Sequence, residues 1–227
     1  MGLQLDRVVP WGRSFSEYRR MFALTDEDLQ RSILDCAGGP ASFNAELTPL
    51  GGRVVSCDPI YAFSAREIRD RIDRTFPEIV EGVKGNLEKY VWTPEIPTPE
   101  ALGRVRMQAM ERFLQDFPAG LGDRYRVAEL PHLPFAGGEF DLALCSHLLF
   151  TYSDLLSLEF HLEAIAELLR VAREVRIFPL LNLAGERSPW CDRVLGTLKG
   201  MGNATEIVTV DYEFQTGGDQ NLEDSAT

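Results

Sequence analysis

Short apolar runs alternate with amphipathic stretches along most of the chain, and this alternation predicts a parallel α/β sheet. We expect strands at 32–36, 53–57, 125–130, 140–145, 174–178 and 206–214, and helices at 41–50, 64–76, 98–117, 154–172 and 188–199. The helix at 154–172 shows the clearest pattern, because Leu158, Leu162, Ile165 and Leu169 recur at helical spacing with acids opposite them. Strands that alternate with helices indicate a doubly wound sheet with crossover helices on both faces.

Three stretches depart from this alternation. Residues 1–30 are expected to form an N-terminal helical extension. Residues 77–122 show no strand pattern and contain five prolines around the helix at 98–117, so we interpret them as a helical insertion, or lid, before the third strand. The acidic tail, 215–227, is a candidate for disorder. The predicted organisation is therefore one domain over 1–227 with these three additions.

Several expected strands end at residues suited to binding a nucleoside. Asp35 ends the first strand before the small-residue turn Cys36-Ala37-Gly38-Gly39-Pro40-Ala41, Asp58 ends the second, and Glu129 lies at the end of the third. The carboxyl ends of parallel strands share one edge of a sheet, which is where ligands bind such folds. A small-residue turn lets the backbone approach a ligand, and an acid after the second strand can accept from ribose hydroxyls. Turn formation and strand termination are alternative roles for Asp35 and Asp58.

These residues resemble the motifs of class I S-adenosylmethionine (SAM)-dependent methyltransferases. The resemblance rests on Asp35 and its turn, on Asp58, and on Glu129-Leu130-Pro131-His132-Leu133-Pro134-Phe135 followed by Phe140-Asp141; it covers roughly 30–60 and 123–214. It implies a Rossmann-like, mostly parallel sheet with SAM as cofactor. Glycine is usual in this family where Ala37 and Ala41 stand, and we expect no positive φ at an alanine. The family's antiparallel seventh strand is expected to be short or absent.

The resemblance also implies roles for individual residues. It places Ala37, Gly38 and Gly39 against the methionine part of SAM and Asp35 near its ammonium group. Asp58 and Pro59 would meet the ribose, Glu129 and Leu130 the adenine, and Ser146 the methionine side. N-terminal helices close over the cofactor in related enzymes, so Tyr18 and Arg19 are candidates to contact its carboxylate. A helix that only packs on the sheet is the alternative for these two.

Three residues are candidates for the chemistry. His147 follows the fourth strand and could take a proton from the acceptor, or could be a structural histidine of that loop. Tyr152 lies on the same loop. Arg106 falls on the apolar face of the lid helix, where it could clamp an anionic acceptor, snorkel, or form an internal ion pair.

Composition narrows the partners. The chain has 23 basic and 35 acidic residues and a net charge of −12, which disfavours nucleic acid. The four cysteines are widely spaced, so no metal site is expected, and no run is apolar and long enough for a membrane helix. The first residues show no signal-peptide pattern, so we expect a cytoplasmic location. A small-molecule acceptor is the expected partner, and a homodimer is left open.

The predicted function is therefore methyl transfer from SAM. A SAM-binding protein without turnover, serving a regulatory or partner-binding role, is the alternative. A nicotinamide oxidoreductase is disfavoured because the turn lacks the G-x-G-x-x-G spacing.

Overall fold

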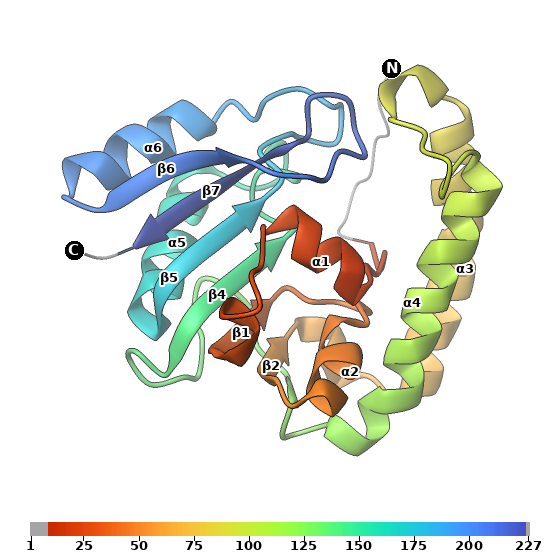
Figure 1. Ribbon diagram of the computed structural model, residues 1–227, viewed down its shortest axis with the longest axis horizontal. Helices are drawn as coiled ribbons and strands as arrows, with labels where there is room; N and C mark the ends of the chain where they lie inside the picture. Colours follow the sequence, from red (N-terminus) through yellow and green to blue (C-terminus); the bar gives the residue numbers. More distant parts are fainter. Residues whose placement is uncertain (1–8, 226–227) are drawn as a thin grey trace.

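A seven-stranded sheet forms the centre of the computed structural model, which describes residues 9–225 (Figure 1). Its strands are β1 (Ser32–Cys36), β2 (Arg53–Cys57), β3 (Tyr125–Arg126), β4 (Phe140–Ser146), β5 (Ala172–Phe178), β6 (Ala204–Thr209) and β7 (Gln220–Ser225). Their order across the sheet is β3-β2-β1-β4-β5-β7-β6. All neighbours are parallel except β7, which is antiparallel to both β5 and β6. The predicted doubly wound, mostly parallel sheet is therefore confirmed.

Helices cover both faces of the sheet because successive strand side chains point to opposite sides. Helices α1 (Phe15–Met21) and α2 (Phe43–Leu47) lie on one face, and α5 (Leu158–Val171) and α6 (Cys191–Gly200) on the other (Figure 1). Ile33 of β1 belongs to the core under α1 and α2, whereas its neighbour Leu34 belongs to the core under α5 and α6. Both side chains are fully buried.

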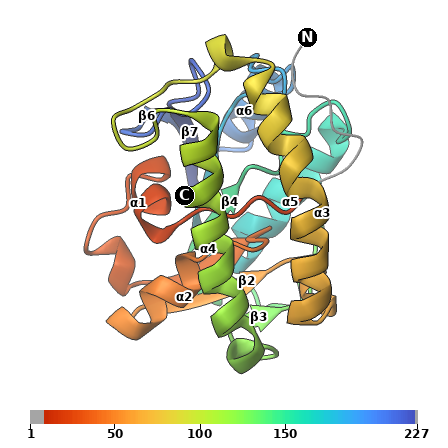
Figure 2. The same ribbon diagram turned by 90° about the vertical axis from the view of Figure 1, so that its right-hand side faces the viewer.

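Two long helices stand beside the sheet rather than on either face. Helices α3 (Ala65–Lys84) and α4 (Pro99–Gly120) pack against each other near β2 and β3 (Figure 2). The sequence predicts that α3 ends at residue 76, but it continues through Pro77 for two more turns. Pro77 is exposed, so the carbonyl that loses its amide partner can reach water. Ile79 and Val83 continue the buried stripe of this helix, and their packing favours its extension.

The tail does not follow the sequence prediction. Residues 220–225 form β7, which lies between β5 and β6, while 226–227 lie outside the described residues. This strand was hard to predict because Leu222 is its only large apolar residue. Its polar residues are paired instead: Asp224 is buried and accepts from Thr205 Oγ1 at 2.5 Å and from Asn203 Nδ2 at 2.9 Å. Paired polar groups avoid the desolvation cost that would otherwise exclude them from a central strand.

Strand β3 is shorter than expected, with two residues in place of six. It lies at the edge of the sheet, where its ladder with β2 is limited to the last two residues of that strand. At Asp58 the chain leaves β2 for a 3-10 turn, η3 (Pro59–Ala62), so β3 has no further partner. Within residues 9–225, no helix is both long enough and apolar enough to span a membrane.

Candidate functional site

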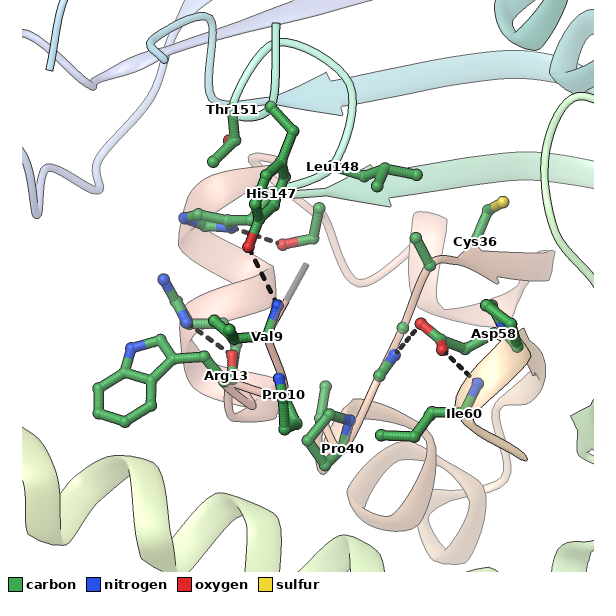
Figure 3. Close-up of a pocket in the computed structure, with 18 of the residues that line it drawn as sticks. Val9, Pro10, Arg13, Cys36, Pro40, Asp58, Ile60, His147, Leu148 and Thr151 are labelled. Atoms are coloured by element: carbon green, nitrogen blue, oxygen red, sulfur yellow. Dashed lines mark hydrogen bonds between the residues drawn. The ribbon is translucent and has the colours of Figure 1, made fainter. Parts of the chain in front are cut away.

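A cavity of about 920 Å³ lies at the carboxyl ends of β1, β2 and β4. The turn after β1, the start of η3, the loop after β4 and the segment 9–13 border it (Figure 3). Residues of helix α3 line its remaining side. Most predicted site residues line it: Tyr18, Ala37, Gly38, Gly39, Asp58, Pro59, Glu129, Leu130, Ser146, His147 and Tyr152. The volume is near the upper end of the roughly 300–1,000 Å³ usual for small-molecule sites.

The turn after β1 contains a glycine whose position leaves no room for a side chain, and an alanine in an unfavourable backbone conformation. A Cβ on Gly38 would lie 2.3 Å from Asp35 Oδ2, so any other residue would displace this carboxylate, which Ser56 holds by a hydrogen bond. Gly39 has φ 51°, and Ala37 has φ 58°. The expectation that alanine avoids positive φ is therefore wrong at Ala37. The tight reversal of the chain above Asp35 imposes this conformation, which costs an L-residue about 1–2 kcal/mol.

Asp58 connects the end of β2 to this turn. Its Oδ2 accepts from Gly39 N at 3.0 Å and its Oδ1 from Ile60 N at 2.8 Å (Figure 3). Each carboxylate oxygen keeps a second lone pair for a ligand hydroxyl. Burial raises the pKa of Asp58 to about 6 despite these two bonds.

Asp35 lies beneath the turn and does not line the cavity. Its Oδ1 accepts from Tyr18 Oη at 2.9 Å and its Oδ2 from Ser56 Oγ at 2.8 Å. Burial raises the pKa of Asp35 to about 6, although both hydroxyls favour its charged form. Direct contact between Asp35 and a ligand in the cavity is therefore not what the structure shows. Tyr18, which does line the cavity, stands between them.

The loop after β4 presents a neutral histidine. His147 has φ 52°, and its backbone amide donates to Phe178 O at 2.7 Å. Its Nδ1 lies 2.8 Å from Ser146 Oγ. Burial lowers the pKa of His147 well below its usual value, and the positive charges of Arg13 and Arg106 act in the same direction. The imidazole is therefore uncharged at neutral pH and can accept a proton.

The segment 9–13, which we call the N-terminal strap, closes the cavity opposite Asp58 (Figure 3). Tyr152 Oη accepts from Val9 N at 3.3 Å, so this predicted site residue anchors the strap. A Cβ on Gly12 would lie 2.2 Å from Pro40 O, which shows how closely the strap lies on the turn after β1.

With this geometry in place, the chain can be compared with known proteins. It is 34% identical over 220 residues to a protein of Methanocaldococcus jannaschii named Uncharacterized protein MJ0045, and the match covers 97% of both chains. The chain belongs to the MJ0045 family. No protein-family model matches its sequence.

Several solved structures resemble this member of the MJ0045 family. Magnesium protoporphyrin IX methyltransferase from Synechocystis PCC 6803 with bound SAM is 16% identical, with a TM-score of 0.45 over 89% of this chain and 73% of that chain. A SAM-dependent methyltransferase from Aquifex aeolicus is 15% identical, with a TM-score of 0.42 over 92% and 90%. The sheet itself, with its single antiparallel strand β7 beside β5, has the class I SAM-dependent methyltransferase fold.

Besides Asp35, two predicted residues lie away from the cavity. Arg19 is on the outer side of α1, where its guanidinium pairs with Asp26 at 2.8 Å, so it does not reach a ligand in the cavity. Arg106 is completely buried and forms an ion pair with Glu17, which also accepts from Tyr212 Oη at 2.9 Å. Of the roles left open for Arg106, the structure therefore shows the internal ion pair and not the clamp.

Burial opposes the charge of Glu17, but Arg106 and Arg13 outweigh this effect and lower the pKa of Glu17 to about 2. Arg106 of α4 is therefore paired with Glu17 of α1 and also donates to Tyr212, which follows β6. These bonds connect the three segments.

Sequence reasoning missed Arg13. This strap residue is 6% exposed and lines the cavity; its Nη1 donates to Trp11 O at 2.8 Å. Its Nε has no hydrogen-bond partner in the described part of the chain. A buried donor without a partner is costly, so Arg13 is suited to an anionic ligand group. It lies outside any periodic element of the sequence, and only its position beside the cavity identifies it.

Among residues 9–225, no three His, Cys, Asp or Glu side chains lie close enough together to hold a metal ion. The cysteines in this range are all buried and unpaired. Burial raises the pKa of Cys145 to about 12, so this thiol is not a ready nucleophile.

Proposed function

We propose that this protein is a SAM-dependent methyltransferase that acts on a small molecule. The observation that carries this proposal is the position of Asp58, whose carboxylate lies at the end of β2, bonded to the turn after β1 and facing the cavity. This fold binds ligands beyond the carboxyl ends of its strands, and an acid at this position can accept from the two ribose hydroxyls of a nucleoside.

The residues present fit SAM in three respects. Gly38 and Gly39 leave backbone exposed to the cavity where the methionine part would lie. Asp58 has free lone pairs for the ribose, and Glu129 and Leu130 line the cavity where an adenine edge would be recognised. Arg13 offers an unpartnered donor and replaces Arg19 as our candidate for the carboxylate of the cofactor. Asp35 would act on the ammonium group through Tyr18 or water.

SAM supplies an electrophilic methyl group, which an acceptor atom displaces from sulfur while the electron pair of the broken bond stays on sulfur. His147 is uncharged and lines the cavity, so it can take the proton that an O–H or N–H acceptor loses. If Nδ1 of His147 donates to Ser146 Oγ, Nε2 is left as the proton acceptor. Ser146 thus positions the imidazole.

A small-molecule acceptor is favoured by enclosure and by charge. The N-terminal strap and α3 cover the cavity, and the chain carries a net charge of −12. A polymer of nucleotides would meet repulsion from that charge and would not fit beneath the strap.

Calorimetry with S-adenosylhomocysteine (SAH) and with NAD tests the cofactor. We expect the chain to bind SAH and not NAD, whereas NAD binding without SAH binding would overturn the proposal. Transfer of a labelled methyl group from SAM to a metabolite extract then tests turnover. His147→Gln, which keeps a hydrogen-bonding side chain but no base, is the control. Tight SAH binding with no labelled product in any extract would favour the alternative of a binding protein without turnover.

A further inference from the structure

The cavity extends well beyond the residues proposed for the cofactor. Its far part, which we call the distal chamber, is lined by Trp11, Ile79, Val83, Tyr90, Leu183 and Phe214. Trp11 comes from the strap, and Ile79 and Val83 from the second half of α3. Tyr90 lies between α3 and α4, Leu183 between β5 and α6, and Phe214 between β6 and β7. The segments of Tyr90 and Phe214 are joined: Val91 N donates to Phe214 O at 2.8 Å, and the rings of Tyr90 and Phe214 lie 4.8 Å apart. No charged side chain is among the six.

Two arginines in the first half of α3 line the same cavity, with Arg71 half-buried and Arg74 exposed. The Arg71 guanidinium lies 3.8 Å from the centre of the Phe63 ring, and Arg74 follows one turn later. Neither guanidinium has a side-chain hydrogen bond or an ion pair within residues 9–225. Glu67 lies one turn before Arg71 and feels its charge, but its carboxylate forms its hydrogen bonds in the capping box with Ser64. In contrast, Arg69, on the side of the helix that faces α4, pairs with Glu111 of that helix at 3.7 Å.

One helix, α3, therefore contributes both the charged end and the apolar end of the cavity. Arg71, Thr75, Ile79 and Val83 are spaced four residues apart and all line the cavity. At a rise of 1.5 Å per residue, about 18 Å separates the level of Arg71 from that of Val83. This wall of the cavity thus changes from cationic to apolar along its length. The distance is roughly that spanned by a molecule with two rings or with a long alkyl chain.

The charges of the proposed cofactor do not account for these two arginines. Among the described residues, five charged side chains line the cavity: Arg13, Asp58, Glu129, Arg71 and Arg74. The first three are matched by the carboxylate, ribose and adenine of SAM in the proposed function. SAM has no second anionic group, so Arg71 and Arg74 are left for another ligand.

We infer that the methyl acceptor is an amphipathic anion, with an apolar body in the distal chamber and a carboxylate or phosphate group held by Arg71 and Arg74. This inference rests on the proposed function for the identity of the reaction, but the binding site it describes can be tested separately. The planar guanidinium groups of two arginines suit either oxyanion. The aromatic lining of the chamber suits a ring-containing body.

A matched pair of fluorescent probes tests the charge requirement. Anilinonaphthalene sulfonate carries an anionic group, and N-phenylnaphthylamine has the same rings without it. With the chain saturated by SAH, we expect the sulfonate to bind about tenfold more tightly than the neutral probe. The double variant Arg71→Gln, Arg74→Gln should remove that difference and leave the neutral probe unaffected.

The control is Arg66→Gln, Arg69→Gln, which changes the charge of the same helix by the same amount at residues that do not line the cavity. It should leave both probes unchanged. Val83→Thr keeps the side-chain shape and should weaken both probes alike. Equal binding of the two probes to the unmodified chain would overturn the inference, and so would an Arg71/Arg74 variant that binds the sulfonate normally.

Cofactor binding separates this inference from the proposed function. SAH affinity should stay within about twofold in the Arg71/Arg74 variant; a parallel loss of SAH binding would assign these arginines to the cofactor and overturn the inference. If the unmodified chain does not bind SAH, the proposed function fails, and the probe comparison made without SAH still decides whether an amphipathic anion binds.

The acceptor itself is tested with an extract separated by anion exchange. Labelled methyl should appear in compounds that the exchanger retains and that also enter an organic phase. Treatment of the extract with a phosphatase distinguishes the two oxyanions, because it destroys a phosphate acceptor and spares a carboxylate. Labelling confined to unretained, neutral compounds would contradict the inference.

Discussion

Protonation of Asp58 should weaken cofactor binding in mildly acidic solution. Burial raises the pKa of this carboxyl to about 6, so it changes charge within an accessible pH range. Ribose hydroxyls donate to the ionised form, and a protonated carboxyl offers them one acceptor fewer. A ligand that selects the ionised form must bind less tightly as the pH falls through the pKa of the free protein.

The size of the effect follows from the ionised fraction. At about pH 7 roughly nine tenths of Asp58 is ionised, and at about pH 5 roughly one tenth. The apparent dissociation constant for SAH should therefore rise about tenfold between these pH values, which corresponds to about 1.4 kcal/mol. Asp58→Asn removes the charge and one of the two oxygens. Because a hydrogen bond to a charged group contributes about 1.5–3 kcal/mol, this variant should bind SAH about 10- to 100-fold less tightly at about pH 7.

Isothermal titration calorimetry with SAH across this pH range measures both effects. Asp35 also has a pKa of about 6, but it lies beneath the turn and remains in the variant. The negative charge of Asp58 helps to raise the pKa of Asp35, so the pH dependence that survives in Asp58→Asn should be that of Asp35, moved to lower pH. Asp123→Asn, at an exposed site away from the cavity, is the matched control. The reasoning is refuted if wild-type affinity is constant over this range, or if Asp58→Asn binds SAH as the wild type does.

Three further predictions concern strain, chemistry and stability. Ala37→Gly should raise the free energy of unfolding in urea by about 0.5–1 kcal/mol, because it relieves a positive φ; Ala41→Gly, at a position without that φ, should give no gain. His147→Gln should lower the rate of methyl transfer roughly a hundredfold or more while the dissociation constant for SAH stays the same, and a loss of SAH binding instead would show a binding role. Arg106→Met should lower stability by about 3–5 kcal/mol, since it leaves the buried charge of Glu17 without its partner; activity per folded molecule should persist, and an unchanged melting temperature would contradict the ion-pair interpretation.

The fold was predictable wherever sequence pattern and local chemistry agree. The strands β1 and β4 are apolar over most of their length and buried on both faces, and β2 and β5 carry the short apolar runs Val54-Val55 and Ile177-Phe178, so their pattern survives in a single sequence. Strand β7 was missed because Asp224 and its neighbours are buried only as members of polar pairs with residues far away in the chain. A sequence window cannot show such a partner.

The positions along the chain at which a ligand could bind can be predicted from the sequence. Asp58, Gly38 and His147 each follow a strand, and the carboxyl ends of parallel strands lie at one edge of the sheet. Which charged side chains face the cavity depends instead on how the chain folds. Arg13, on the irregular N-terminal strap, lines the cavity. Arg106, which the apolar pattern of its helix had made a candidate, forms an ion pair with Glu17 instead. A charged side chain is buried at low cost only where another group can pair with it. Such a partner can be far away along the chain, so its presence cannot be predicted from the sequence near the charge.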